Sequence, residues 1–143
     1  MSRQARILIV DDDKPTVMII SSVLQKQGYE VHTAYDGQAG LEKAREIKPD
    51  LIILDIMMPI MDGYQVCRRL QSDPDTARIA ILMLTAKGGI DEDVKRNYEF
   101  ATRVKDRLQG FDSGAVDFLT KPVKAKDVAL RVKSLLWASG FPV

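Results

Sequence analysis

The chain is poor in cysteine and histidine, on which many metal and covalent sites depend. Its 143 residues include one cysteine and one histidine. Cys67 therefore has no partner for an internal disulfide, and a cysteine-based zinc site is excluded. This composition is typical of a reducing compartment, and we expect a cytoplasmic protein. His32 stands alone on a predicted strand, which argues against a metal site or a phosphohistidine there.

The sequence also lacks an excess of charge of one sign and long apolar runs. Lysine and arginine total 21, aspartate and glutamate 20, and the net charge is +1. Proteins that bind nucleic acid through bulk charge show a basic excess, so we expect no direct nucleic-acid partner. The longest apolar runs, 56–61 and 79–84, are far too short to cross a bilayer. The N-terminus has no stretch typical of a secretory signal, and we expect no membrane partner.

What the chain does contain is one ordinary globular domain built from alternating strand and helix patterns. Continuous or alternating apolar segments predict strands over 7–10, 29–34, 51–54, 79–84 and 115–119. Helical spacing predicts helices between 15 and 28, over 39–47, around 66–70, over 91–109 and over 127–137. This order predicts an α/β fold, namely a doubly wound five-stranded parallel sheet with helices on both faces. We assign residues 6–138 to the domain, 1–5 to an N-terminal tail and 139–143 to a C-terminal tail.

Polar residues follow four of the predicted strands. Asp11 and Asp12 follow the first, Asp55 the third, Thr85 the fourth and Lys121 the fifth. In parallel sheets the ligand crevice lies beyond the carboxyl ends of the strands, so these side chains should converge at one edge. Asp13, the next residue after Asp12, is expected to cap a helix rather than to bind a ligand.

Three carboxylates at one edge indicate a cation site. Two like charges about 4 Å apart cost roughly 4 kcal/mol at an effective dielectric of 20. Such a cluster takes up protons or binds a cation, and hard oxygen ligands favour Mg²⁺, which commonly bridges to phosphate. Lys121 adds one positive charge, and Thr85 offers a hydroxyl donor. We infer an aspartate that accepts a phosphoryl group, with catalysis by positioning and electrostatics.

Four motifs in this order resemble the response regulator receiver domain of two-component signalling, which has a flavodoxin-like (βα)₅ fold. They are ILIVDDD at 7–13, PDLIILDIMMPIMDG at 49–63, LTA at 84–86 and GAVDFLTKP at 114–122. One motif alone would be weak evidence. Four motifs at successive strand ends, spanning nearly the whole chain, are specific.

The resemblance implies a role for each acidic residue at this edge. Asp55 would be the phosphorylation site. Asp12 and Asp55 would bind Mg²⁺, or Mn²⁺ in its place, together with the backbone carbonyl of Met57, and Asp11 would bind through water. Met57 and Lys87 each lie two positions beyond a site residue, and we expect them to tune the lifetime of the acyl phosphate.

The resemblance also implies a switch. Lys121 would contact phosphoryl oxygens, and the peptide bond between Lys121 and Pro122 would be cis. Thr85 would hydrogen-bond the phosphoryl group and couple it to the surface. Phe118 occupies the aromatic switch position; because phenylalanine lacks a hydroxyl, a signal there must be a change of rotamer and packing. The output would be a population shift on the face of the fourth helix, fifth strand and fifth helix.

By the same resemblance the chain is a signalling domain rather than an enzyme in the usual sense. Its donor would be a histidine kinase or a histidine phosphotransfer protein, and its target a downstream protein or a covalently linked effector. One alternative is a pseudo-receiver that binds partners without phosphorylation. An aspartate-nucleophile phosphatase is disfavoured because Met57 stands where those enzymes carry a second carboxylate. A flavin protein is disfavoured because the acidic edge would repel a cofactor phosphate.

The segment 88–110 is longer than a strand-to-strand crossover needs. Its apolar stripe and acid-before-base pairs predict one lengthened fourth helix over 91–109, ended by Gly110. Part of this helix should project and expose Tyr98 or Phe100. We expect a partner or homodimer contact there. The alternatives are a solvated extension without a partner, and a loose loop hinged at Gly88 and Gly89 that reaches the phosphorylation site.

Four smaller expectations concern single residues. Asp36 and the pair Asp62 and Gly63 are interpreted as turns. Cys67 should be a small buried hydrophobic residue, and Trp137 is expected to pack the last helix.

Overall fold

The computed structural model describes residues 3–86 and 116–141. Within these ranges the chain forms one parallel sheet of five strands in the order β2-β1-β3-β4-β5. The strands are β1 (Arg6–Val10), β2 (Glu30–Ala34), β3 (Leu51–Asp55), β4 (Ala80–Thr85) and β5 (Val116–Thr120). The order reverses after β2, so β1 has β2 on one side and β3 on the other. This reversal confirms the doubly wound parallel sheet predicted from the sequence.

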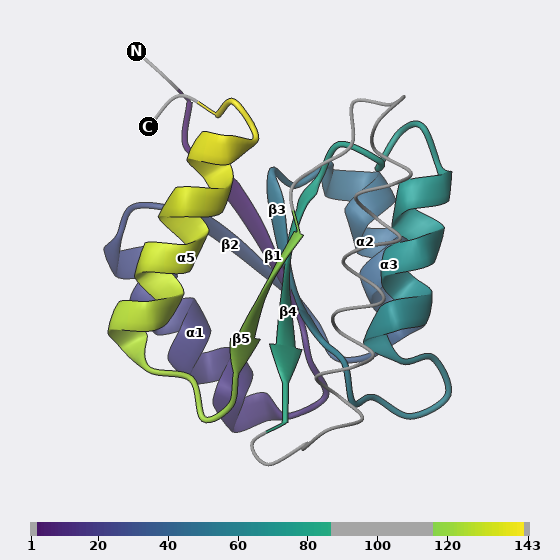
Figure 1. The fold of residues 1–143 in the computed structure, drawn as a ribbon, viewed down its shortest axis with the longest axis horizontal. Coiled ribbons are helices and arrows are strands. Elements are labelled where there is room, and N and C mark those ends of the chain that lie inside the picture. Colours follow the sequence, from purple (N-terminus) through teal and green to yellow (C-terminus); the bar gives the residue numbers. More distant parts are fainter. Residues whose placement is uncertain (1–2, 87–115, 142–143) are drawn as a thin grey trace.

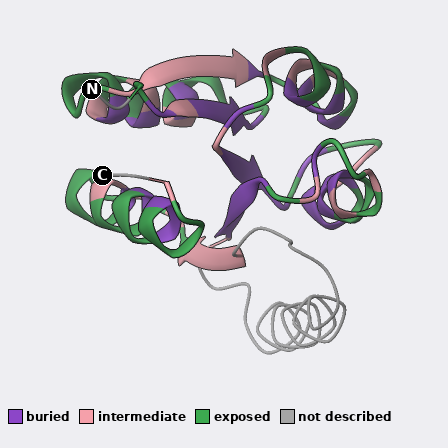
Figure 2. Ribbon diagram, turned by 90° about the horizontal axis from the view of Figure 1, so that it is seen from above, coloured by how far each residue is buried: buried purple, intermediate pink, exposed green. Residues whose placement is uncertain are grey.

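Helices cover both faces of the sheet. α1 (Lys14–Lys26) and α5 (Ala125–Ala138) pack on one face, and α2 (Gly37–Ile47) and α3 (Gly63–Ser72) pack on the other (Figure 1). Figure 2 shows the buried surface of each helix turned towards the sheet and the exposed surface turned outwards.

The segments 7–10, 51–54 and 80–84 of the central strands are continuously apolar because both faces of these strands are covered. On β1, Ile7 and Ile9 belong to the core beneath α1 and α5, whereas Leu8 and Val10 belong to the core beneath α2 and α3. Every residue of β3 and β4 is buried. Burial on both faces removes the polar alternation of a half-exposed strand, which is why these segments were recognisable as continuous apolar runs.

The observed boundaries lie close to the predicted ones. Gly28, predicted to end the first helix, has φ +92, a left-handed conformation that glycine adopts without a steric penalty. Helix α5 buries four residues, Val128, Val132, Leu135 and Leu136. The expectation for Trp137 was wrong, because this residue is 75% exposed.

Two residues interpreted as turns are in fact helix caps. The Asp36 carboxylate accepts a hydrogen bond from the backbone N–H of Ala39 at 2.7 Å and caps α2. Asp62 and Gln65 form a reciprocal capping box that begins α3, with hydrogen bonds of 2.9 and 3.0 Å. An aspartate followed three positions later by glutamine, ahead of an apolar run, is the signal for this motif, and it was present in the sequence.

Several predictions fall outside the described residues. They are the lengthened helix over 91–109 with its end at Gly110, the exposure of Tyr98 or Phe100, the contact through 88–110 and the role of Lys87. In the part of the chain that is described, no helix combines the length and hydrophobicity needed to span a bilayer.

Candidate functional site

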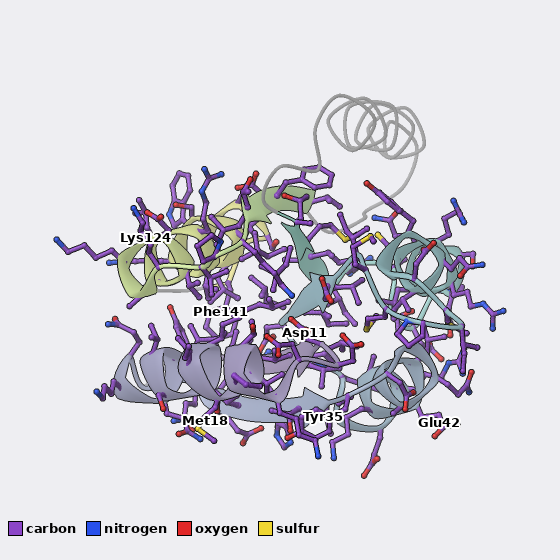
Figure 3. The ribbon with its side chains drawn as sticks, turned by 90° about the horizontal axis from the view of Figure 1, so that it is seen from below. Asp11, Met18, Tyr35, Glu42, Lys124 and Phe141 are labelled. Carbon is purple, nitrogen blue, oxygen red and sulfur yellow. The ribbon has the colours of Figure 1, made fainter. Side chains whose placement is uncertain are left out.

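Four strands deliver polar residues to one edge of the sheet. Asp11 follows β1, Asp55 ends β3, Thr85 ends β4 and Lys121 follows β5. The strands are parallel and in register, so these residues meet at the carboxyl edge, where Figure 3 shows Asp11. The structure thus brings together the residues that the sequence had placed at this edge.

Asp11 has no exposed surface. Its backbone N–H donates to the carbonyl of Ala34 at 3.1 Å, which prolongs the pairing of β1 with β2 by one residue. Its Oδ1 accepts a hydrogen bond from the backbone N–H of Asp13 at 2.9 Å. Asp13 occupies the N-cap position of α1, as expected, although its side chain accepts from the Thr16 hydroxyl and not from the helix backbone.

Asp55 is likewise buried, at the end of the central strand β3. Its Oδ1 accepts a hydrogen bond of 3.3 Å from the backbone N–H of Met57, whose own side chain is exposed. After Asp55 the loop over 56–62 brings the chain back beside the end of β3, where α3 begins. A Cβ at Gly63 would lie 2.5 Å from the Asp55 carbonyl oxygen, so only glycine lets the helix begin so close to the strand end.

Lys121 lies between the two buried carboxylates. Its ammonium nitrogen is 3.0 Å from Asp11 Oδ2 and 3.4 Å from Asp55 Oδ1. Its backbone N–H donates to the Thr85 carbonyl at 2.7 Å, which fixes the end of β5 against the end of β4. The peptide bond between Lys121 and Pro122 is cis. The Lys121 ammonium therefore forms ion pairs with both buried carboxylates.

This charge balance shows in the pKa values. Burial and the nearby Asp11 carboxylate raise the pKa of Asp55 from 3.8 to about 7, although Lys121 and the Met57 N–H pull it down. Burial opposes the charge of Lys121, but its contacts with Asp11 and Asp55 outweigh that effect and raise its pKa. The single charge of Lys121 thus does not fully offset the buried carboxylates, and Lys121 stays protonated.

A cation fits this arrangement. Asp11, Asp12 and Asp55 each offer a carboxylate oxygen, and these atoms all lie within 4.8 Å of one another. Asp11 Oδ2 is buried and makes no well-directed hydrogen bond in the described structure; its contact is the ion pair with Lys121. Asp12, in contrast, is exposed and open to an entering ion. Hard carboxylate oxygens at this spacing could hold a divalent metal.

The sequence profile of the response regulator receiver domain matches residues 7–133. The chain belongs to this family. Receiver domains are phosphoacceptor signalling domains that interact with histidine kinases and downstream effectors, and they are not enzymes in the usual sense.

Two curated relatives and one solved structure illustrate the match. The chain is 44% identical to the DNA-binding dual master transcriptional regulator RpaA of Synechocystis sp., with 92% of this chain and 48% of that protein aligned. It is also 44% identical to the response regulator PleD of Caulobacter vibrioides, over 92% of this chain and 26% of that protein. A putative response regulator from Chloroflexus aurantiacus has a TM-score of 0.74 and 35% identity, covering 94% of this chain and 99% of that one. The receiver domain thus spans about half or less of these curated relatives' lengths.

The fold is the flavodoxin-like fold of CheY. The chemotaxis protein CheY4 of Vibrio cholerae matches with a TM-score of 0.77 at 28% identity, covering 93% of this chain and 99% of that one.

Two further predicted residues of this receiver domain lie on β4 and β5, the strands next to β3 on one side of the sheet. The buried hydroxyl of Thr85 lies 3.3 Å from the hydroxyl of Thr120 on the neighbouring strand and donates to it. Phe118 is half-buried on β5, pairs in register with Met83 and packs against the core beneath α2 and α3. Thr120 was not singled out from the sequence; its contact depends on the register of β4 with β5.

Proposed function

We propose that Asp55 accepts a phosphoryl group from the phosphohistidine of a histidine kinase or a histidine phosphotransfer protein. The observation that carries this proposal is the position of Asp55, buried at the end of β3 with Lys121 3.4 Å away. A lysine at that distance balances a carboxylate before phosphorylation and a phosphoryl oxygen after it.

The transfer is a substitution at phosphorus. A carboxylate oxygen of Asp55 attacks the phosphorus in line, the phosphorus–nitrogen bond of the phosphohistidine breaks, and its electron pair returns to the imidazole. The product is an acyl phosphate. Dephosphorylation is a separate hydrolysis step. Water attacks the phosphorus, the bond to the Asp55 oxygen breaks, and the carboxylate and inorganic phosphate are released.

The acidic cluster would hold the divalent cation that this family uses. We assign Asp12, Asp55 and the backbone carbonyl of Met57 as ligands of Mg²⁺ or Mn²⁺, with Asp11 bound through water. When bound, the metal supplies positive charge that offsets the crowded carboxylates and the incoming phosphoryl oxygens. Because Asp55 has a raised pKa, added positive charge also favours the deprotonated form that can attack phosphorus.

The remaining residues turn a local change of charge into a signal. We assign to the Thr85 hydroxyl, now hydrogen-bonded to Thr120, the donation of a hydrogen bond to the phosphoryl group. If the Thr85 hydroxyl exchanged Thr120 for the phosphoryl group, the ends of β4 and β5 would shift, and Phe118 on β5 packs against the core beneath α2 and α3. The output face would include β5 and α5, and its target would be a downstream protein or a covalently linked effector. RpaA, a longer relative, is named a DNA-binding transcriptional regulator, which makes a linked effector a natural arrangement here.

The test is phosphorylation by a small donor. The protein is incubated with acetyl phosphate and MgCl₂, and intact mass reports the gain of one phosphoryl group. We expect stoichiometric labelling that requires the metal and is lost in Asp55→Asn but kept in Asp75→Asn, which alters an exposed carboxylate away from the site. Unlabelled parent protein would overturn the proposal and favour a pseudo-receiver that binds partners without phosphorylation.

A further inference from the structure

The Thr85 hydroxyl already has a hydrogen-bond partner outside the acidic cluster. Thr85 ends β4 and is buried, with 7% of its surface exposed. A hydroxyl at such a position needs a partner, because a buried polar group without one lowers stability. The partner is the hydroxyl of Thr120 at the end of β5, which accepts this hydrogen bond at 3.3 Å. In the unphosphorylated protein the Thr85 donor is thus in use.

The pairing of β4 with β5 explains why Thr120 reaches this hydroxyl. Thr85 and Thr120 are partners in the parallel register, so their side chains leave the sheet on the same face. One residue further along β5, the backbone N–H of Lys121 donates to the Thr85 carbonyl at 2.7 Å. Thr85 is therefore bound twice to the end of β5, through its carbonyl and through its hydroxyl. The side-chain bond decides which way the hydroxyl points.

Thr120 and the phosphoryl group compete for one donor. A threonine hydroxyl carries a single hydrogen, so it donates fully to one acceptor at a time. The phosphoryl group on Asp55 is the second acceptor, since the proposed function assigns a bond between it and Thr85. That bond forms only when the bond from Thr85 to Thr120 breaks. Thr120 therefore stabilises the unphosphorylated arrangement and makes phosphorylation less favourable by the same amount.

The surroundings of Thr120 suit a hydrogen bond that has to be broken. Thr120 is exposed, so water can replace Thr85 as its partner after the exchange. A buried acceptor would instead be left without a partner, which would oppose the exchange. The 3.3 Å separation is also long for two hydroxyls, which are usually about 2.7–2.8 Å apart. A charged phosphoryl oxygen is the stronger acceptor and can take the hydrogen.

We propose that Thr120 is a positioning residue that sets the affinity of this receiver domain for its phosphoryl group, by engaging the Thr85 hydroxyl until Asp55 is phosphorylated. The inference rests on the proposed function and deepens it, since it concerns the state that phosphorylation must displace. Lys121 contacts the acceptor directly, with its ammonium 3.4 Å from Asp55, whereas Thr120 acts only through Thr85.

The experiment measures the binding of BeF₃⁻, a stable mimic of the phosphoryl group, in the presence of MgCl₂. The ¹⁹F NMR signal of the bound ion gives an apparent Kd for the full chain without a kinase and without turnover. Thr120→Val and Thr120→Ala remove the hydroxyl, whereas Thr120→Ser keeps it. Thr33→Val is the matched control, because Thr33 is a strand threonine on β2, at the opposite end of the sheet order from β5.

We expect Thr120→Val and Thr120→Ala to bind BeF₃⁻ roughly three- to tenfold more tightly than the parent, since the Thr85 hydroxyl no longer has a bond to break. Thr120→Ser and Thr33→Val should resemble the parent. In the Thr85→Val background Thr120→Val should change nothing, because both substitutions act through one hydrogen bond. A loosened strand end would weaken binding, so the direction of the change separates positioning from damage to the fold.

Unchanged or weaker binding by Thr120→Val and Thr120→Ala would overturn the inference. An equal gain in Thr120→Ser would also overturn it, because the hydroxyl would then not be the cause. So would a gain that persists in the Thr85→Val background, since Thr120 would then act without Thr85. A parent protein that neither binds BeF₃⁻ nor is labelled by acetyl phosphate is a different result, because it removes the proposed function itself.

Discussion

The Lys121 ammonium lies 3.0 Å from Oδ2 of Asp11, a carboxylate with no exposed surface. The same nitrogen lies 3.4 Å from Asp55 Oδ1, so one cation holds two buried anions that repel each other. Asp12 adds a third carboxylate within 4.8 Å. In the metal-free receiver domain the carboxylates at this edge therefore repel one another. Changes at the site should alter the free energy of unfolding as well as the rate of phosphorylation.

Replacing Lys121 by methionine should destabilise the metal-free protein. The substitution keeps the length of the side chain but leaves Asp11 and Asp55 without their counterion. We expect a loss of roughly 1–3 kcal/mol in the free energy of unfolding, less than for a fully buried pair because 25% of the Lys121 side chain is exposed. Urea denaturation in EDTA measures the change. Lys124→Met, which alters an exposed lysine three residues on, should leave stability within about 0.5 kcal/mol of the parent; equal losses in both variants would contradict this account.

The stability of the metal-free protein should fall as pH rises from about 4 to about 7, through the titration of Asp55. Its pKa is raised from 3.8 to about 7 in the folded state. In that interval the folded state binds more protons than the unfolded state, so raising the pH favours unfolding. Asp55→Asn removes the titrating group and should be the more stable protein above about pH 7, by on the order of 1–4 kcal/mol.

The measurement is urea unfolding in EDTA at several pH values, with Asp75→Asn as the control. The gap between Asp55→Asn and the parent should shrink as the pH falls towards 3.8 and close below it, where the parent carboxyl is protonated in both states. A gap of constant size across the range would show that Asp55 does not titrate there.

Magnesium should stabilise the parent protein and fail to stabilise Asp12→Asn. An ion that binds only the folded state at about 100 times its Kd adds about 2.7 kcal/mol to the free energy of unfolding. Thermal unfolding with and without MgCl₂ reports this as a rise in Tm. Asp13→Asn is the matched control, because Asp13 is exposed, adjacent in sequence and engaged with the Thr16 hydroxyl at the start of α1. An equal response to MgCl₂ in Asp12→Asn and Asp13→Asn would rule out Asp12 as a ligand.

Much of this architecture was predictable because the apolar pattern of each strand segment matches the burial of that strand in the sheet. The segments 7–10, 51–54 and 79–84 are uniformly apolar, and the structure buries their strands on both faces. Since parallel strands end at one edge, the polar residues that follow them could be placed together before any geometry was known. This rule accounts for the meeting of Asp11, Asp55 and Lys121.

Other features depend on tertiary structure and have no local signal. Asp11 and Asp12 are neighbours of the same type, yet one is buried and the other exposed, because the chain turns away from the sheet between them. The ion pair of Arg3 with Asp50 joins the starts of β1 and β3 and requires that these strands be adjacent. Ile60 has φ +69, a left-handed backbone conformation that β-branched residues avoid, so its residue type predicts a negative φ there.

Gly63 should not tolerate even a methyl group. Its ideal Cβ would lie 2.5 Å from the Asp55 carbonyl oxygen and 2.8 Å from the Ile56 Cα, both backbone atoms that cannot rotate away. Gly63→Ala should therefore lower the free energy of unfolding by about 1–3 kcal/mol and displace Asp55, lowering its rate of phosphorylation by acetyl phosphate.

Gly28→Ala is an informative comparison, because a Cβ there meets nothing within 4 Å and the loss of stability comes only from φ +92. We expect Gly28→Ala to lose roughly 1 kcal/mol of stability while Asp55 reacts at the parent rate. Urea unfolding and intact-mass kinetics on both variants separate the two effects, and a normal phosphorylation rate in a folded Gly63→Ala protein would show that the start of α3 does not position Asp55.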